Sequence, residues 1–454
     1  MASKMDRPTP LTTQPPGWGP GRRSLPEVHG TVPIPVGGGF WRKMIAFAGP
    51  GYLVAVGYMD PGNWATDLAG GARFGYTLLS VIVLSNFMAI LLQSLAARLG
   101  IASGRDLAQA CRDAYSRRTT LFLWVLCEIA IAACDLAEVL GAAIALQLLF
   151  GLPLIWGVCL TSLDVLIVLY VQHHGFRWVE AIVVILILGI ASCFAVELYM
   201  ARPDIRLLAA GMVPQTVILR NPEMLYISIG ILGATVMPHN LYLHSSIVQT
   251  RKYGDSFESK AEAIRYASID SAFALMFALF INAAILVMAA ATFHGTSHES
   301  VAGIADAYVL LTPLLGTAAA STLFAVALLF SGQNATLTGT LAGQIVMEGF
   351  LNIRLRPWLR RLITRLLAIV PAIIVILIYG ERGSEPLLVL SQVILSLQLP
   401  FAIFPLVRFT SDPRFMGPFT NKPWINALAW PVVIVIGALN VYLLYQTAVA
   451  FFGS

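Results

Sequence analysis

The sequence has few charged residues for its length. Only 12% of its 454 residues are Asp, Glu, Lys or Arg, whereas 57% are hydrophobic, and the mean hydropathy is +0.77. Soluble globular domains carry about 25% charged residues, so this chain has too little polar surface to face water on all sides. The deficit is explained if most of the surface faces lipid. The composition therefore argues against a soluble enzyme, and we expect no enzymatic activity.

Signals for other classes of protein are also missing. The five cysteines form no CxxC pair and four lie inside apolar runs, which speaks against a disulfide framework or a thiolate metal site and favours inert buried thiols. The HExxH motif of metal-dependent proteases is absent. The net charge of +5 does not come from a continuous basic stripe, so no nucleic-acid partner is expected.

Long apolar runs are what the sequence does have. A helix needs about 20 mainly apolar residues to cross the bilayer core, and this criterion gives about eleven spans, at roughly 44–72, 76–99, 119–147, 152–172, 177–200, 222–250, 264–293, 317–347, 359–379, 385–407 and 425–451. Residues 1–38 are rich in Pro, Gly, Thr and Arg and lack the apolar core of a signal peptide, so a disordered cytoplasmic tail is predicted there. The sequence predicts an all-α integral membrane protein with one transporter domain at 39–454.

The distribution of basic residues predicts the orientation. With the N-terminus inside, about 24 of the Lys and Arg residues fall in cytoplasmic segments, as the positive-inside rule requires. An odd number of spans then places the C-terminus outside. The expected location is the cell inner or plasma membrane, with lipid as the surrounding partner and a monomer as the simplest state.

Two of the predicted spans are interrupted at corresponding positions. The first contains the sequence DPGN at residues 60–63, and the sixth contains MPHN at residues 237–240. Proline removes a helical hydrogen bond and glycine weakens the helix, so both spans should unwind there. Unwound backbone at membrane depth is tolerated only where it faces protein or a watery cavity. Either break alone could be a tolerated kink, but the pair predicts an inverted repeat with the substrate site between the breaks.

The residues at the breaks predict the kind of substrate. A carboxylate such as Asp60 near the bilayer centre costs about 2.5–3.5 kcal/mol, so it needs a cation or a proton as partner. Asn63 offers an amide oxygen, and unwinding frees carbonyls, with those of Gly57 and Ala234 as the best candidates. Oxygens alone would suit Na⁺, Ca²⁺ or Mg²⁺. The thioether of Met237 favours Mn²⁺ and Fe²⁺ instead, unless that side chain is only apolar filler.

The DPGN and MPHN motifs, the second followed by LYLHS at 241–245, closely resemble signatures of the Nramp family of divalent-metal transporters. Looser matches are GGARFGY (70–76), GIASGR (100–105), DLAE (135–138) and LSQVILS (390–396), and the resemblance runs from about Phe40 to the C-terminus. Bacterial manganese and iron importers look most similar. The resemblance implies a LeuT-like fold of two inverted five-helix repeats, at about 44–200 and 222–407, with 425–451 as an extra helix.

The same resemblance implies a set of metal ligands. The side chains of Asp60, Asn63 and Met237 and the carbonyls of Gly57 and Ala234 are expected to bind metal. Gln392, in the tenth span, is implied as a further ligand in some states.

Titratable residues inside the predicted spans indicate a route for protons. Glu128, Asp135 and Glu138 lie 7 and 10 residues apart, which places them on one face of the third span. Three buried acids need partners. The candidates on other spans are His239, His244, Arg360 and Arg361. The family resemblance implies that Asp60, His239, Asp135, Glu138 and the arginines form a proton path separate from the metal exit, although a salt-bridge network that only holds helices together is an alternative.

These observations predict a secondary active transporter that imports Mn²⁺, Fe²⁺ and similar metals by proton symport and alternating access. The metals are substrates, protons are the coupling ions, and no permanent cofactor is expected. The alternative is a sodium-coupled organic-solute symporter of the same fold. Such proteins hold a substrate carboxylate at half-helix N-termini, and the Asp60 carboxylate would repel it.

Overall fold

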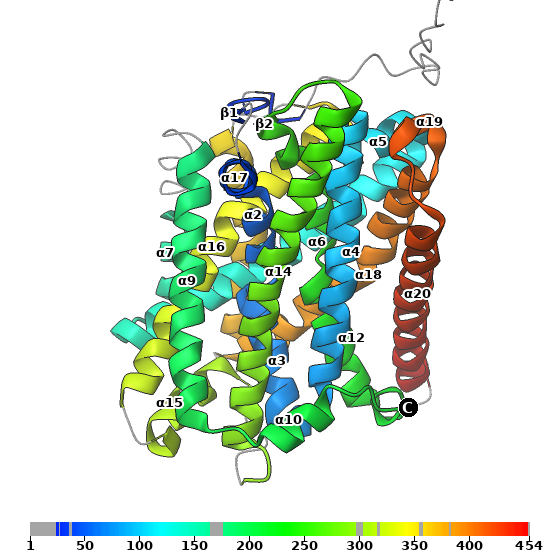
Figure 1. Cartoon of the computed structure of the whole chain (residues 1–454). Helices are drawn as coiled ribbons and strands as arrows, with labels where there is room; N and C mark the ends of the chain where they lie inside the picture. The colour runs from blue at the N-terminus through cyan, green and yellow to red at the C-terminus, as the bar shows by residue number, and fades with distance from the viewer. Residues whose placement is uncertain are drawn as a thin grey trace, which may run out of the picture.

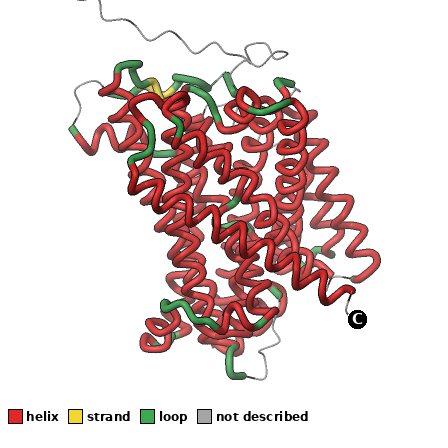
Figure 2. The backbone as a smooth tube through the Cα atoms, turned by 90° about the vertical axis from the view of Figure 1, so that its right-hand side faces the viewer, coloured by secondary structure: helices red, strands yellow, loops and turns green. Residues whose placement is uncertain are grey.

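The structure is a bundle of long helices that run between two ends of the molecule (Figures 1 and 2). The computed structural model describes residues 24–26, 28–35, 39–163, 176–296, 303–315, 318–353, 357–380 and 383–452. Within this part the strands are β1 (Val32–Pro33) and β2 (Arg251–Lys252), which pair in parallel. The prediction of an all-α protein is confirmed.

One group of helices corresponds to the predicted spans. They are α2 (Pro50–Gly57), α3 (Pro61–Phe74), α4 (Leu79–Ser103), α6 (Arg117–Phe150), α7 (Leu154–Leu160), α9 (Phe176–Ala201), α12 (Pro222–Val236), α13 (Pro238–Ile247), α14 (Phe257–Phe293), α16 (Ala318–Leu351), α17 (Pro357–Tyr379), α18 (Ser384–Ser411) and α20 (Pro423–Phe452).

The other helices of the described chain connect them or lie at the two ends. They are α1 (Phe40–Phe47), η1 (Gly75–Leu78), α5 (Leu107–Ala114), η2 (Thr161–Leu163), α10 (Ile205–Gly211), α11 (Val217–Arg220), η3 (Val248–Thr250), α15 (Ile304–Leu315), α19 (Pro413–Met416) and η5 (Gly417–Phe419).

Eight helical segments of the described chain are long and apolar enough to cross a membrane, so the protein is a multi-pass membrane protein. The predicted number of eleven is not reached by length and composition alone. The helices α3 and α4 join through η1 into one segment, Pro61–Ser103. The helix α7 and η2 reach residue 163, and the next described residue is 176. In α17 several side chains before Arg365 lie outside the described residues, and the apolar segment found there is Arg365–Tyr379.

The centre and the edge of the bundle differ in burial. Every residue from Ile227 to Thr250, which covers most of α12 and all of α13, is buried. These two helices pack against α3, α4 and α18, and α6 packs against α16. By contrast, α20 lies at the edge of the bundle and exposes apolar side chains such as Val441 and Tyr445 (Figure 1). An apolar exposed face is typical of a helix in contact with lipid, and the buried centre is where the interrupted helices meet.

Candidate metal-transport site

Both predicted breaks are present. The helix α2 ends at Gly57 and α3 begins at Pro61, whereas α12 ends at Val236 and α13 begins at Pro238. Each second half begins with proline, which has no N–H to donate and is tolerated at the first helical position. Figure 1 shows α2 in the upper half of the bundle and α3 in the lower half. The prediction that helices 1 and 6 are broken is confirmed.

The carboxylate of Asp60 caps α3. Its Oδ1 accepts a hydrogen bond from the backbone N–H of Asn63 at 2.9 Å, as an N-cap residue does. The positive end of the α3 dipole also favours a negative group at this position. The side chain of Asp60 is fully buried. The local sequence thus places a buried carboxylate at the start of α3, at the first break.

Oxygens from both broken helices converge on the side chain of Asn63. Its Nδ2 lies 2.6 Å from Oδ1 of Asp60 and 3.3 Å from the carbonyl oxygens of Gly57 and of Ala234. One nitrogen therefore contacts three oxygen acceptors that belong to two separate breaks. Several oxygens directed at one point are the geometry that a bound cation requires.

Met237 and Gln392 complete this group. A Cβ atom on Gly57 would lie 3.0 Å from the sulfur of Met237, and one on Gly62 would lie 1.7 Å from Nε2 of Gln392. Both side chains are fully buried, and they lie this close to the unwound helix because those two positions are glycines. Met237 and Gln392 thus pack against residues on either side of the first break, which also carries Asp60.

Two oxygens at this point lack donors. Oδ2 of Asp60 and Oε1 of Gln392 are buried and have no hydrogen-bond partner among the described residues. A buried oxygen without a partner is costly, and a cation would satisfy both. The described residues contain no group of three or more His, Cys, Asp or Glu that could hold a metal. The donor set here is instead one carboxylate, neutral oxygens and one thioether.

Two asparagines that sequence reasoning missed hold the unwound segments. Asn282 of α14 donates from Nδ2 to the carbonyl of Tyr58 at 2.7 Å and lies 3.5 Å from Oδ1 of Asn63. Asn240 donates to the carbonyl of Val54 at 3.4 Å and contacts the sulfur of Met237 at 3.6 Å. An amide in an apolar span needs a partner, and this signal could have identified Asn282.

The predicted acids lie on α6, beside the breaks. A Cβ atom on Gly339 of α16 would lie 2.9 Å from Oε1 of Glu138 and 3.3 Å from Oδ1 of Asp135, so the two carboxylates face the same glycine. Cys134, one turn before Glu138, is in one apolar cluster with Met237. One turn after it, Gly141 packs directly against the ring of Pro61. The face of α6 that carries Glu138 therefore adjoins both broken helices.

The basic partner of Glu138 is Arg365. Its Nη1 lies 3.8 Å from Oε2 of Glu138, and its Nη2 donates to Oγ1 of Thr336 at 2.7 Å. The predicted partners were Arg360 and Arg361, whose side chains lie outside the described residues. Arg365 follows Arg361 by four residues, one turn further along α17, and the sequence alone does not determine which arginine reaches the acid.

The other predicted proton carriers are in different environments. His239 is buried, and its Nδ1 has no hydrogen-bond partner in the described part of the chain. Nδ1 of His244 lies 3.0 Å from Oε1 of Gln93, whose amide donates to the hydroxyl of Tyr58 at 2.8 Å. Glu128 is only half-buried and accepts a hydrogen bond from the indole of Trp124. The structure directs Asp135 and Glu138 toward the same glycine, Gly339, and pairs Glu128 with Trp124.

The end of the bundle at which α3 ends and α12 begins is partly open. Arg73 of α3 pairs there with Glu223 of α12. A cavity of about 520 Å³ elsewhere faces outward between α9 and α14 and is apolar, whereas the lining of the cavity of about 370 Å³ at this end contains Arg73, Glu223 and Glu385 beside five uncharged residues. Of these two cavities, the one with charged side chains is the more suitable approach for an ion.

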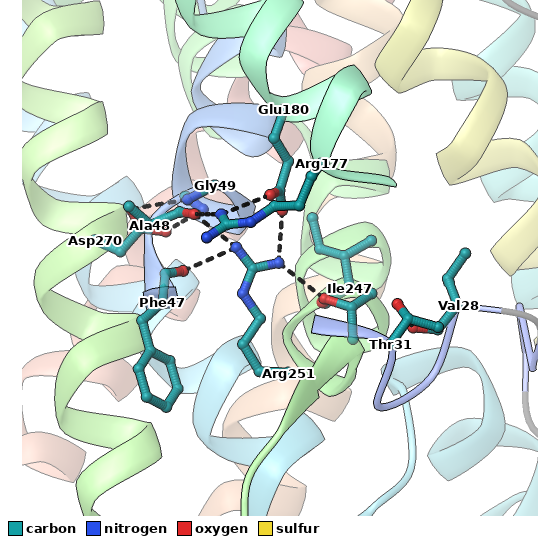
Figure 3. A network of polar contacts seen from close by, with 12 residues as sticks. Val28, Thr31, Phe47, Ala48, Gly49, Arg177, Glu180, Ile247, Arg251 and Asp270 are labelled. Carbon is teal, nitrogen blue, oxygen red and sulfur yellow. Dashed lines mark hydrogen bonds and ion pairs between the residues drawn. The ribbon is translucent and has the colours of Figure 1, made fainter. Parts of the chain in front are cut away.

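At the opposite end, charged side chains bind the backbone at the start of α2. We call the four residues involved the α2 clamp: Arg177, Glu180, Arg251 and Asp270. Figure 3 shows them around the backbone of residues 47–49. Arg251 donates to the carbonyls of Phe47 and Ala48 at 3.1 and 2.6 Å and pairs with Glu180 at 2.6 Å.

The first amides of α2 are bound by the same clamp. Asp270 accepts from the N–H groups of Gly49 and Gly51 at 3.3 and 2.7 Å. Gly49 has φ +139°, and a Cβ atom on it would lie 2.3 Å from the carboxyl carbon of Glu180. Only glycine allows this backbone conformation and this close approach of a carboxylate.

Two helices broken at corresponding positions in an all-helical bundle define an inverted-repeat transporter fold. The chain matches the Nramp family (natural resistance-associated macrophage protein-like) over residues 51–446. It is 65% identical to the divalent metal cation transporter MntH of Nostoc sp. over 94% of this chain and 96% of that protein. The corresponding protein of Bradyrhizobium diazoefficiens is 61% identical over 98% of this chain and 99% of its own length. The chain belongs to the Nramp family.

Solved structures agree with this assignment. The manganese transporter of Eremococcus coleocola is 41% identical, with a TM-score of 0.87 over 95% of this chain and 93% of that chain. Mhp1, a transporter of the nucleobase-cation-symport-1 family, is 14% identical with a TM-score of 0.57 and shares the fold alone. The predicted LeuT-like fold and the resemblance to the Nramp family are confirmed.

Proposed function

We propose that this chain imports Mn²⁺, Fe²⁺ and similar divalent transition metals together with protons, by alternating access. The observation that carries the proposal is the convergence of one carboxylate and two freed carbonyls on the buried Asn63 amide between two broken helices, with the Met237 sulfur packed against Gly57. The relatives at 61–65% identity are named divalent metal cation transporters, and the Eremococcus coleocola protein is named a manganese transporter.

Binding requires one local change. The amide nitrogen of Asn63 lies at the centre of the oxygen donors. We propose that the metal takes this place, and that the Asn63 amide turns over so that Oδ1 faces the ion. The two ends of an asparagine amide have nearly the same shape, so the turn needs little space. The full ligand set is Asp60, Asn63 and Met237 through side chains, Gly57 and Ala234 through carbonyls, and Gln392 in some states.

The thioether decides which dications are preferred. Carboxylate and carbonyl oxygens bind Ca²⁺ and Mg²⁺ as well as transition metals, whereas a thioether contributes little to the hard ions. Met237 therefore favours Mn²⁺ and Fe²⁺ over the abundant alkaline-earth ions. The metals are cargo, and no permanent cofactor is proposed.

The proton route is proposed to run through α6. Glu138 and Asp135 lie beside both breaks, and Arg365 stabilises the ionised form of Glu138. His239 follows Met237 directly and has an unpartnered ring nitrogen, so it can relay a proton between the site and α6. We keep Asp60, Asp135, Glu138, His239 and the α17 arginines in this path, with His244 and Glu128 as peripheral members.

The orientation follows from charge. The α2 clamp, which contains two arginines, lies at the end predicted to be cytoplasmic. We propose that the N-terminus is cytoplasmic and the C-terminus extracytoplasmic, in the cell inner or plasma membrane, with the protein acting as a monomer. The charged cavity at Arg73 and Glu223 then faces outside, and the clamp closes the cytoplasmic exit.

A sodium-coupled organic-solute symporter finds no support in this geometry. A substrate carboxylate would bind the free amides at the N-terminus of α3. The Asp60 carboxylate already accepts from the Asn63 amide there and would repel a second anion.

The decisive experiment is uptake of Mn²⁺ into sealed proteoliposomes under an imposed inward proton gradient. We expect uptake that rises with the gradient and is accompanied by acidification of the lumen. Asp60→Ala should abolish both. Uptake of Mn²⁺ that ignores the proton gradient would contradict the coupling, and no uptake of any divalent metal by the unmodified chain would contradict the function.

A further inference from the structure

A short segment before the first helix lies across the end of the bundle where α2 begins. We call residues 24–26 and 28–35 the inner strap; it contains β1, which lies at the upper end of the molecule in Figures 1 and 2. Ser24, Leu25 and Val32 are exposed by only 1%, 3% and 4%. A segment with this burial is part of the packed structure. Its two ends contact different parts of the bundle.

The first end of the inner strap is bound to α5 and α16. The backbone N–H of Leu25 donates to Oε2 of Glu348 at 3.0 Å, and Nε2 of Gln109 donates to Oγ of Ser24 at 3.2 Å. The other carboxylate oxygen of Glu348 accepts from Gln344 at 2.9 Å. Leu25 has φ +46°, a left-handed conformation that leucine rarely adopts unless its surroundings enforce it. The burial of the Leu25 side chain and the hydrogen bond to Glu348 stabilise this conformation.

The second end is bound to the segment that continues from α13. Val32 pairs in parallel with Arg251, and the N–H of Gly30 donates to the carbonyl of Gln249 at 3.1 Å. Figure 3 shows Val28 and Thr31 of the strap close to Ile247 and Arg251. The side chain of Arg251 belongs to the α2 clamp. The strap is therefore attached to the residue that also holds the start of α2.

The strap thus joins elements that must separate. One end lies on α16, and the other lies on the chain that follows α13, the half-helix whose first residues follow Met237. Release of an ion at this end requires the ends of α2 and α13 to move away from their neighbours, as alternating access demands. The strap is held by the two-residue β1–β2 ladder, by single hydrogen bonds to Gln249, Glu348 and Gln109, and by the apolar packing of Leu25 and Val28. Such contacts can be broken in each transport cycle.

We propose that the inner strap is a latch on the cytoplasmic exit, which must detach from β2 before metal is released. This inference rests on the proposed transport function and deepens it by assigning the N-terminal segment a part in gating. When the strap is docked, it pairs with the backbone of Arg251, whose side chain belongs to the α2 clamp, and the exit is shut. When it is released, Arg251 loses its backbone partner and α2 is free to move.

A reversible cross-link tests the latch. Pro33 and Lys252 are paired in the β1–β2 register and both are exposed. Paired residues on neighbouring strands lie about 5 Å apart, within the range of a disulfide. The variant is Pro33→Cys with Lys252→Cys in the full-length chain. Cys159 is changed to Ser, because it is exposed and the other four cysteines are buried. The two single-cysteine variants are the matched controls.

Mn²⁺ uptake into proteoliposomes is measured after oxidation and again after reduction. Oxidation should lower uptake by the double variant at least about ten-fold, reduction should restore it, and the controls should not respond. Equal uptake by the oxidised and reduced double variant would overturn the latch, because the strap would then be a fixed part of the fold. Failure of the reduced protein and of the unmodified chain to transport would count against the proposed function instead.

Removal of the strap gives a second measurement. A chain without residues 1–35 should exchange internal for external Mn²⁺ several-fold faster than a chain without residues 1–20, which keeps the whole strap. Identical exchange rates in these two folded proteins would also overturn the proposal.

Discussion

The two breaks differ in what they contribute to the site. The first spans residues 58–60 and contributes the carboxylate of Asp60, which also caps α3. The second consists of Met237 alone and contributes a thioether. In the proposed site, the first break supplies the charge that holds the cation, and the second supplies the thioether that distinguishes one dication from another. The proposed site thus assigns affinity to the first repeat and selectivity to the second. This division can be tested one side chain at a time.

The largest effect is expected at the charged break. Asp60→Asn keeps the shape of the side chain and removes its charge. Loss of outer-shell partners alone weakens metal binding 10–100-fold, so loss of the charged ligand should weaken Mn²⁺ binding by more than about 100-fold. Isothermal titration in detergent measures this. The matched control is Asp67→Asn, a second buried acid on α3 two turns away. Equal losses in the two variants would mean that general charge, and not the break, holds the ion.

Coupling to protons should be lost without loss of binding when α6 is changed. Glu138→Gln removes the titratable group beside both breaks and its ion pair with Arg365. We expect Mn²⁺-driven acidification of proteoliposomes to fall at least about ten-fold while binding changes little, because buried acids in transporters act as proton relays. Glu197→Gln is the control, since Glu197 is a buried acid of α9 outside the proposed path. Normal acidification by the Glu138 variant would remove it from the path.

Selectivity should change at the soft break. Met237→Leu keeps an apolar side chain of similar volume and removes the sulfur. Mn²⁺ uptake should persist at a reduced rate, and competition by Ca²⁺ or Mg²⁺ should strengthen by about ten-fold, because the remaining oxygen donors suit those ions. Met288→Leu, at a buried methionine of α14, controls for packing. Unchanged competition in the Met237 variant would show that both breaks act only through oxygen.

The smallest effect is expected at the residue that holds the first break from outside. Asn282→Ala removes the donor to the carbonyl of Tyr58. A neutral hydrogen bond contributes about 1 kcal/mol, so Mn²⁺ affinity should fall by about five-fold while selectivity stays the same. Titration of Mn²⁺ and Cd²⁺ on the same preparation checks both points. A change in the ratio of the two affinities would mean that the breaks are not independent.

The sequence was sufficient for the breaks because those residues violate the rules of their own helices. An acid, two prolines and a glycine in apolar spans have no local explanation, so DPGN and MPHN predicted the two breaks that the structure shows. The partner of Glu138 was not predictable in the same way. Arg360, Arg361 and Arg365 share one end of α17, and only packing determines which one reaches α6.

The inner strap was not predictable from the sequence. Residues 1–38 have the composition of a disordered tail, and nothing in the pattern distinguishes 24–35 from the rest. The partner of Leu25 is Glu348, which is 323 residues away along the chain. An irregular segment that is held by contacts so distant in sequence carries no periodic signal. The described part of the structure yields eight spans and not eleven for a related reason: a criterion of length and hydropathy does not detect a span that is short or interrupted.

The single carboxylate of the site has a consequence for the voltage across the membrane. With Asp60 ionised, the empty site carries one negative charge, and the site loaded with a dication carries one positive charge. A voltage that is negative inside pulls the loaded site inward and drives the empty site back outward, with about 2.3 kcal/mol per charge per 100 mV if the whole field is crossed. Both halves of the cycle are then electrogenic in the favourable direction, whereas a second acid at this point would leave the loaded step electrically silent.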